Sequence, residues 1–79
     1  MKNTAEQKYE AVIAGETREY TGHTSKAAAR RSVHEAHNPC LIEINADGRI
    51  LYDAFPLGHP LPKGSRMIER CSFGKWRKV

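Results

Sequence analysis

The sequence predicts a small α+β domain: an antiparallel sheet of about five strands, ordered ββαβββ, with one helix packed on a face of the sheet. Strand-like segments flank turn-forming residues at Gly15-Glu16 and again at Asn45-Ala46-Asp47-Gly48, and a helical pattern lies between these two pairs. A chain of 79 residues can bury one core. Residues 1–79 are therefore expected to form a single domain, with residues 1–7 as a flexible N-terminus and residues 74–79 as a basic tail.

Five segments are predicted to be strands. The first hairpin pairs residues 8–14 with residues 17–21. The second pairs residues 40–44 with residues 49–54, where apolar and other side chains alternate on each strand. Residues 66–73 can form a last strand, although their mixed alternation does not define which face is buried.

One helix is predicted between the hairpins. Thr24 offers a side-chain oxygen as its N-cap, and the helical pattern runs from Ser25 to about His37. Asn38-Pro39 ends this helix because proline disfavours helical geometry in the residue before it and has no amide hydrogen to donate. A narrow face of small residues that includes Ala29 and Val33 lets the helix lie flat on a sheet.

Positive charge is concentrated in the second part of the chain. Residues 25–79 hold ten Lys or Arg against five Asp or Glu, and after Pro62 only Glu69 opposes six Lys or Arg. Such asymmetry favours an acidic partner, with DNA or RNA as the first candidate. The cations, with one aromatic ring for stacking, are predicted to form a single binding face. Its residues are Lys26, Arg30, Arg31, Lys63, Arg66, Arg70, Lys75, Trp76, Arg77 and Lys78.

The two cysteines are expected to be free thiols in a reducing compartment, and no metal or cofactor is predicted. The alternative is a zinc site built from His34, His37 and Cys40, with Cys71 as a fourth ligand. Pro39 argues against it because it redirects the chain between the second and third ligands. The strand pattern also places Cys40 in the core.

No catalytic motif surrounds either cysteine, and the sequence contains neither a phosphate-binding glycine loop nor a recognisable pair of nuclease acids. We therefore expect a protein that is not an enzyme. The catalytic alternative is a toxin-like ribonuclease with His59, Lys63 and Arg66 as acid, base and phosphate contact. The competing interpretation of His59 is a structural one, in a proline-rich turn.

The sequence contains neither an apolar run long enough to span a membrane nor a signal-peptide stretch at its N-terminus. These features predict a soluble protein of the cytoplasm that does not bind membranes. A small sheet with open edges can be a monomer or pair into a homodimer, and the sequence specifies neither.

The layout resembles the small anti-CRISPR proteins with which bacteriophages block type I surveillance complexes, of the I-C or I-F kind. The resemblance is one of architecture over most of the chain. Three parts carry it: the hairpin from Tyr9 to Tyr20, the helix start Thr24-Ser25-Lys26-Ala27-Ala28-Ala29-Arg30, and the hairpin from Leu41 to Tyr52. It implies a non-catalytic inhibitor that binds a Cas protein of a type I complex in the host bacterial cytoplasm and blocks recognition of target DNA.

One departure from that class concerns charge. Many such inhibitors imitate DNA with acidic surfaces, whereas this chain is basic. Two mechanisms remain under the resemblance: docking on an acidic patch of a Cas subunit through Arg30, Arg66 and Arg70, or competition for the DNA with the same arginines. The alternative function is a small nucleic-acid-binding module, such as a phage or plasmid regulator.

Overall fold

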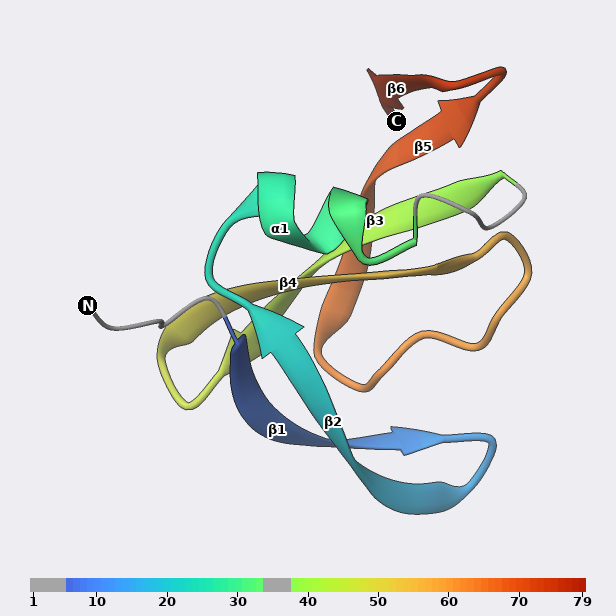
Figure 1. Ribbon diagram of the computed structural model, residues 1–79. Coiled ribbons are helices and arrows are strands. Elements are labelled where there is room, and N and C mark those ends of the chain that lie inside the picture. The colour runs from blue at the N-terminus through green and yellow to red at the C-terminus, as the bar shows by residue number, and fades with distance from the viewer. Residues whose placement is uncertain (1–5, 34–37) are drawn as a thin grey trace.

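Six antiparallel strands form one sheet in the order β1-β2-β4-β3-β5-β6, with one short helix, in a computed structural model that describes residues 6–33 and 38–79 (Figure 1). The elements in chain order are β1 (Glu6–Ile13), β2 (Glu16–His23), α1 (Lys26–Arg31), β3 (Pro39–Ala46), β4 (Arg49–Pro56), β5 (Ser65–Ser72) and β6 (Lys75–Lys78). The predicted single α+β domain with an antiparallel sheet and one helix is confirmed. The sheet has six strands because residues 75–78, predicted to lie in a tail, pair with β5.

Three hairpins close through two-residue turns in which both residues have positive φ. The turns are Ala14-Gly15, Asp47-Gly48 and Phe73-Gly74, with φ of 56° and 83°, 55° and 81°, and 53° and 79°. This geometry matches the right-handed twist of the flanking strands. Glycine adopts a positive φ at low steric cost, which suits it to the second position of each turn. The first turn is thus one residue earlier than predicted, because Gly15 takes its second position and Glu16 already belongs to β2.

The helix is shorter than predicted. Ser25, not Thr24, is its N-cap, and the Ser25 Oγ accepts a hydrogen bond from the Ala28 backbone N–H at 3.1 Å. The helix ends at Arg31, where the Ser32 hydroxyl donates to the Ala29 carbonyl at 2.7 Å and competes with continuation of the helical bonds. Residues 34–37 of the predicted helix, like the predicted N-terminus up to residue 5, lie outside the described residues.

The sheet is covered on both sides. The β1–β2 hairpin folds over one side, and α1 packs on the other against β4, β2 and β3 (Figure 1). The hairpin can fold over because β2 pairs with β4 through a single residue pair, His23 with Tyr52. We call these two sides the hairpin face, which carries Cys40, Ile42 and Ile44 of β3, and the helix face, which carries Leu41.

The main core lies on the hairpin face. Its buried residues are Tyr9, Ala11, Ile13, Ile42, Ile44 and Leu51, with Tyr20, Ala46, Phe55 and Met67 packed against them. A smaller core on the helix face contains Ala29 of α1 and Leu41, both 0% exposed. Gly22 permits close approach within the main core, because a Cβ there would sit 3.1 Å from the Tyr9 ring.

Candidate functional site

The predicted binding face is divided between the two sides of the sheet by an irregularity in the pairing of β3 with β5. The register shifts between Leu41 and Ile42, so one extra residue of β5 stands without a partner there. Arg66 consequently lies opposite Glu43 on the helix face, whereas Arg70 lies opposite Cys40 on the hairpin face. The prediction that Arg66 and Arg70 belong to a single binding face is wrong for this reason.

Two of the predicted arginines already have acidic partners. The Arg66 Nε donates to Glu43 Oε1 at 3.1 Å. The Arg30 guanidinium binds both carboxylate oxygens of the largely buried Glu69, at 3.0 and 2.8 Å, and lies 6.0 Å from the centre of the Trp76 ring. Such a bidentate pair fixes the guanidinium in place. Arg30 therefore orients Trp76, and its charge is compensated within the protein.

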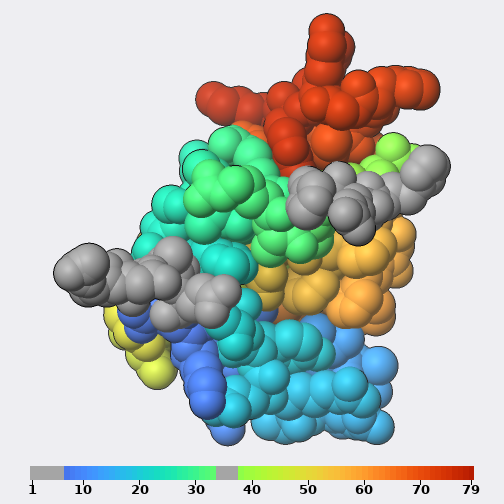
Figure 2. All heavy atoms as spheres, viewed as in Figure 1, coloured from blue at the N-terminus to red at the C-terminus, as the bar shows by residue number. Residues whose placement is uncertain are grey.

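A second group of cations lies on the hairpin face of the β5–β6 hairpin. Arg70 and Arg77 stand directly opposite each other, and Lys75 stands opposite Ser72 on the same face. None of these three cations has an acidic partner within residues 6–33 and 38–79, and all three are exposed. We call Arg70, Lys75 and Arg77 the cationic cluster. It occupies the strand pair at one end of the sheet, which stands out from the body of the molecule (Figure 2).

The other predicted cations lie outside this cluster, and Lys26 and Lys78 line a hollow on the helix face together with Arg66. Lys26 of α1 sits 5.9 Å from the centre of the Tyr52 ring, and Lys78 stands opposite Glu69 on the helix face. Lys63 lies in the loop that connects β4 with β5, and Arg31 is the last residue of α1. The ten predicted residues thus form no single patch.

Phe73 is a candidate binding residue that the sequence analysis missed. It occupies the first position of the β5–β6 turn and is 99% exposed. The corresponding positions of the other two turns hold Ala14 and Asp47. A left-handed conformation costs a residue with a bulky side chain about 1–2 kcal/mol. A residue whose backbone is strained and whose large apolar ring is fully exposed contributes little to folding. The position of Phe73 therefore points to a contact outside the chain.

Replacing Phe73 by asparagine is expected to stabilise the folded protein. Asparagine is favoured in the first position of such a turn, and no packing is lost because the ring is exposed. The gain should be about 0.5–1 kcal/mol. Urea denaturation of the Phe73→Asn variant measures it, and a variant less stable than the parent would show that the ring contributes to the fold.

A hollow lies between the end of α1 and the β5–β6 hairpin. It measures about 590 Å³, within the range of small-ligand pockets. Its lining combines aromatic and apolar groups with guanidinium groups. The described residues that line it are Arg30, Arg31, Val33, Asn38, Pro39, Cys71, Ser72, Phe73, Gly74 and Trp76. The pocket therefore joins the oriented Trp76 ring to the exposed Phe73.

The described members of the alternative metal and catalytic sets are not brought together. Cys40 and Cys71 are free thiols on opposite faces, and burial raises the pKa of the Cys40 thiol, against the effect of the Arg70 charge. His34 and His37 lie outside the described residues. His59 stacks on Phe55 at 4.5 Å on the hairpin face, so it does not meet Arg66, which pairs with Glu43 on the helix face. The exposed Lys63 lies in the loop between them.

A buried polar pair in the main core was also missed. The Tyr9 hydroxyl donates to Asp53 Oδ2 at 2.7 Å, and the Ala54 backbone N–H donates to Asp53 Oδ1 at 2.8 Å. Burial raises the pKa of Asp53, while these two hydrogen bonds and the charges of His23 and His59 act in the opposite direction. Burial also raises the pKa of Tyr9. Tyr9 therefore keeps its proton and donates a hydrogen bond to Asp53.

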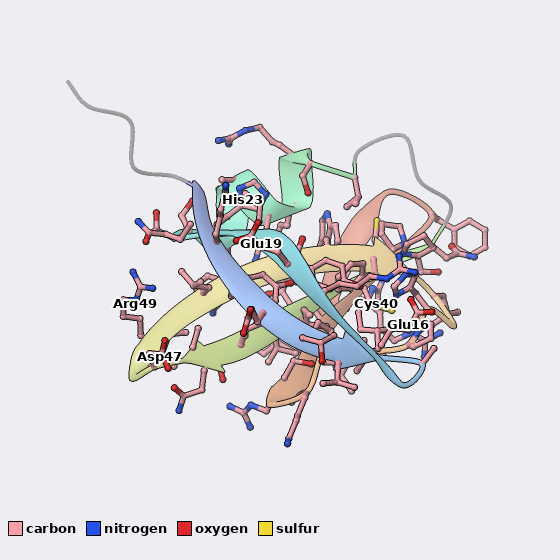
Figure 3. All side chains as sticks on the ribbon, turned by 90° about the horizontal axis from the view of Figure 1, so that it is seen from below. Glu16, Glu19, His23, Cys40, Asp47 and Arg49 are labelled. Carbon is pink, nitrogen blue, oxygen red and sulfur yellow. The ribbon has the colours of Figure 1, made fainter. Side chains whose placement is uncertain are left out.

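His23 is a second buried polar group near this pair. It lies at the end of β2 beside α1 (Figure 3) and is largely buried. Its Nδ1 has no hydrogen-bond partner among the described residues. The ring stands opposite Tyr52 on the helix face, so the sheet separates it from the Asp53 carboxyl.

Comparison of the chain with protein-family models, with curated proteins and with solved structures finds no match. The helix α1 has six residues, and no helix in the described part of the chain has the length and apolar character needed to cross a membrane.

Proposed function

We propose that this chain is a non-catalytic module that binds the anionic backbone of a nucleic acid through the cationic cluster. One observation carries the proposal. Arg70 and Arg77 stand directly opposite each other, next to Lys75, and none of the three has an acidic partner in the described residues. Like charges in directly opposed positions of a sheet destabilise it. A bound phosphate removes that repulsion, and guanidinium groups bind phosphate oxygens in pairs.

A pair of opposed acidic residues on the β1–β2 hairpin provides an internal comparison. Glu10 and Glu19 also stand directly opposite each other, on the β1–β2 hairpin, but Lys8 lies 3.9 Å from Glu19 and offsets part of their repulsion. No charge of opposite sign plays this part for Arg70 and Arg77 among the described residues. This difference supports the binding of an external anion at the cationic cluster.

Salt dependence of binding tests the proposal. Fluorescence anisotropy with a labelled single-stranded oligonucleotide is measured over a series of salt concentrations. Contact of the three cations with three phosphates gives a slope of about −2 in a plot of the logarithm of the binding constant against the logarithm of salt concentration. A slope near zero, or no binding of either this strand or a duplex at low salt, would contradict the proposal.

The open edge of β6 favours a second candidate, the inhibitor function that the resemblance implies. β6 is the last strand of the sheet, so one side of its backbone has no strand partner among the described residues. Such an edge can add to a strand of another protein. In this candidate the hairpin docks on a Cas protein of a type I surveillance complex and blocks target DNA. Formation of a stable complex with a purified surveillance complex, and loss of its DNA binding, tests it. Retained DNA binding by the complex would exclude it.

A further inference from the structure

We propose that the pocket between α1 and the β5–β6 hairpin takes an unpaired nucleobase, so that the bound nucleic acid is single-stranded. This inference rests on the proposed function and deepens it, because the cationic cluster by itself does not distinguish a duplex from a single strand. Four features of the described residues carry it: the oriented Trp76 ring, the exposed Phe73 ring, the size of the pocket and the position of the cations.

Trp76 offers a fixed stacking surface. Its ring lies on the helix face, where the guanidinium of Arg30 approaches it at 6.0 Å, and Glu69 holds that guanidinium with two hydrogen bonds. Trp76 is only partly buried and lines the pocket. A ring held in this way loses little freedom when a base stacks on it, which favours stacking.

Phe73 supplies a second aromatic ring at the rim of the same pocket. It is 99% exposed, so none of the described residues covers it. Each of the two rings can stack on any base, because all bases have a π face. Bases in a duplex are already stacked and must be unstacked at a cost of several kcal/mol before they can enter a pocket. An unpaired strand avoids that cost.

The cations lie where the backbone of such a strand can reach them. β6 is one of the two edge strands of the sheet, and Trp76 alternates along it with Lys75 and Arg77. Successive side chains of a strand point to opposite faces. A nucleic-acid strand that follows the open edge of β6 can therefore place a base on the Trp76 side and its phosphates against Lys75 and Arg77. Because the base is bound by stacking, we expect little dependence on its identity.

Three oligonucleotides of equal length separate base binding from phosphate binding: a strand of about twelve thymidines, an abasic strand with the same phosphates, and a duplex. Trp76 is the only tryptophan, so its fluorescence reports on the pocket directly. We expect the thymidine strand to quench this fluorescence and to bind about 5- to 150-fold more tightly than the abasic strand, with the duplex also weaker.

Phe73→Asn and Leu57→Ala are the test and control variants, because Leu57 is also exposed but lies in the loop after β4. Phe73→Asn should weaken thymidine binding about 5- to 10-fold and leave abasic binding unchanged, whereas Leu57→Ala should change neither. Equal affinity for thymidine and abasic strands without quenching, or a preference for the duplex, would overturn the inference while leaving the proposed function in place. Absence of binding to all three would overturn the proposed function itself.

Discussion

Replacing Arg70 and Arg77 together by glutamate is expected to weaken nucleic-acid binding on the order of 100-fold or more at low salt. Each substitution changes the local charge by two units. One unit of charge at about 4 Å from a phosphate is worth about 1 kcal/mol even in bulk water. Both residues lie on one face of the β5–β6 hairpin, so the two changes act on the same stretch of backbone. Anisotropy measurements with the labelled single strand give the affinity.

Arg18→Glu with Arg49→Glu is the matched control, because both residues are exposed and lie outside the β5–β6 hairpin. It reverses the same charge and should change affinity far less. Arg70→Glu alone adds a check on folding, because it places an acid opposite Arg77 and should stabilise the hairpin by about 0.2–1 kcal/mol while weakening binding. If the control pair lost as much affinity as the test pair, net charge rather than the cationic cluster would determine binding.

Tyr9→Phe is expected to destabilise the domain by about 1–3 kcal/mol near neutral pH, because it leaves the buried Asp53 carboxylate without one of its donors. Burial raises the pKa of Asp53, so its ionisation opposes folding. The stability from this group is present below its usual pKa and is lost as the pH rises through the raised value. The Tyr9 hydroxyl limits this loss because its hydrogen bond favours the carboxylate. The cost of Tyr9→Phe should therefore be larger at neutral pH than in acid.

Urea denaturation of the parent and the variant at about pH 7 and about pH 3.5 measures this difference, because the lower pH lies below the usual pKa of an aspartate and therefore favours the protonated carboxyl. Tyr20→Phe is the control. Tyr20 stacks on Tyr9 at 5.7 Å, but its hydroxyl makes no hydrogen bond among the described residues. Its cost should be small and similar at both pH values. An equal cost of Tyr9→Phe at both pH values would show that the bond does not support the charged carboxylate.

The residues in the turns explain which hairpins could be predicted from the sequence. Asp47-Gly48 is a favoured pair for a two-residue hairpin turn, and the strands on both sides alternate clearly, so this hairpin was predicted nearly as observed. The last hairpin was missed because its turn begins with Phe73, which is disfavoured at positive φ. The glycine after it was the available signal, since Gly15 and Gly48 take the same turn position.

The sequence could not predict that the residues of the binding face lie on two sides of the sheet. A strand with regular alternation would place Arg66 and Arg70 on one face, and only the irregular pairing of β5 with β3 separates them. The ion pairs of Arg30 and Arg66 join residues distant in sequence, so they depend on the tertiary fold. Asp53 carried a local signal, as an acid between Leu51 and Phe55 at alternate positions of a strand that faces the core.

Mapping of amide chemical shifts tests most directly whether the β5–β6 hairpin is the nucleic-acid-binding surface. Unlabelled single-stranded oligonucleotide is titrated into the isotope-labelled protein, and the shift of each backbone amide is followed. The largest changes should fall on residues 70–77, which contain the cationic cluster, Phe73 and Trp76. Largest changes on the β1–β2 hairpin, with residues 70–77 unaffected, would contradict the account.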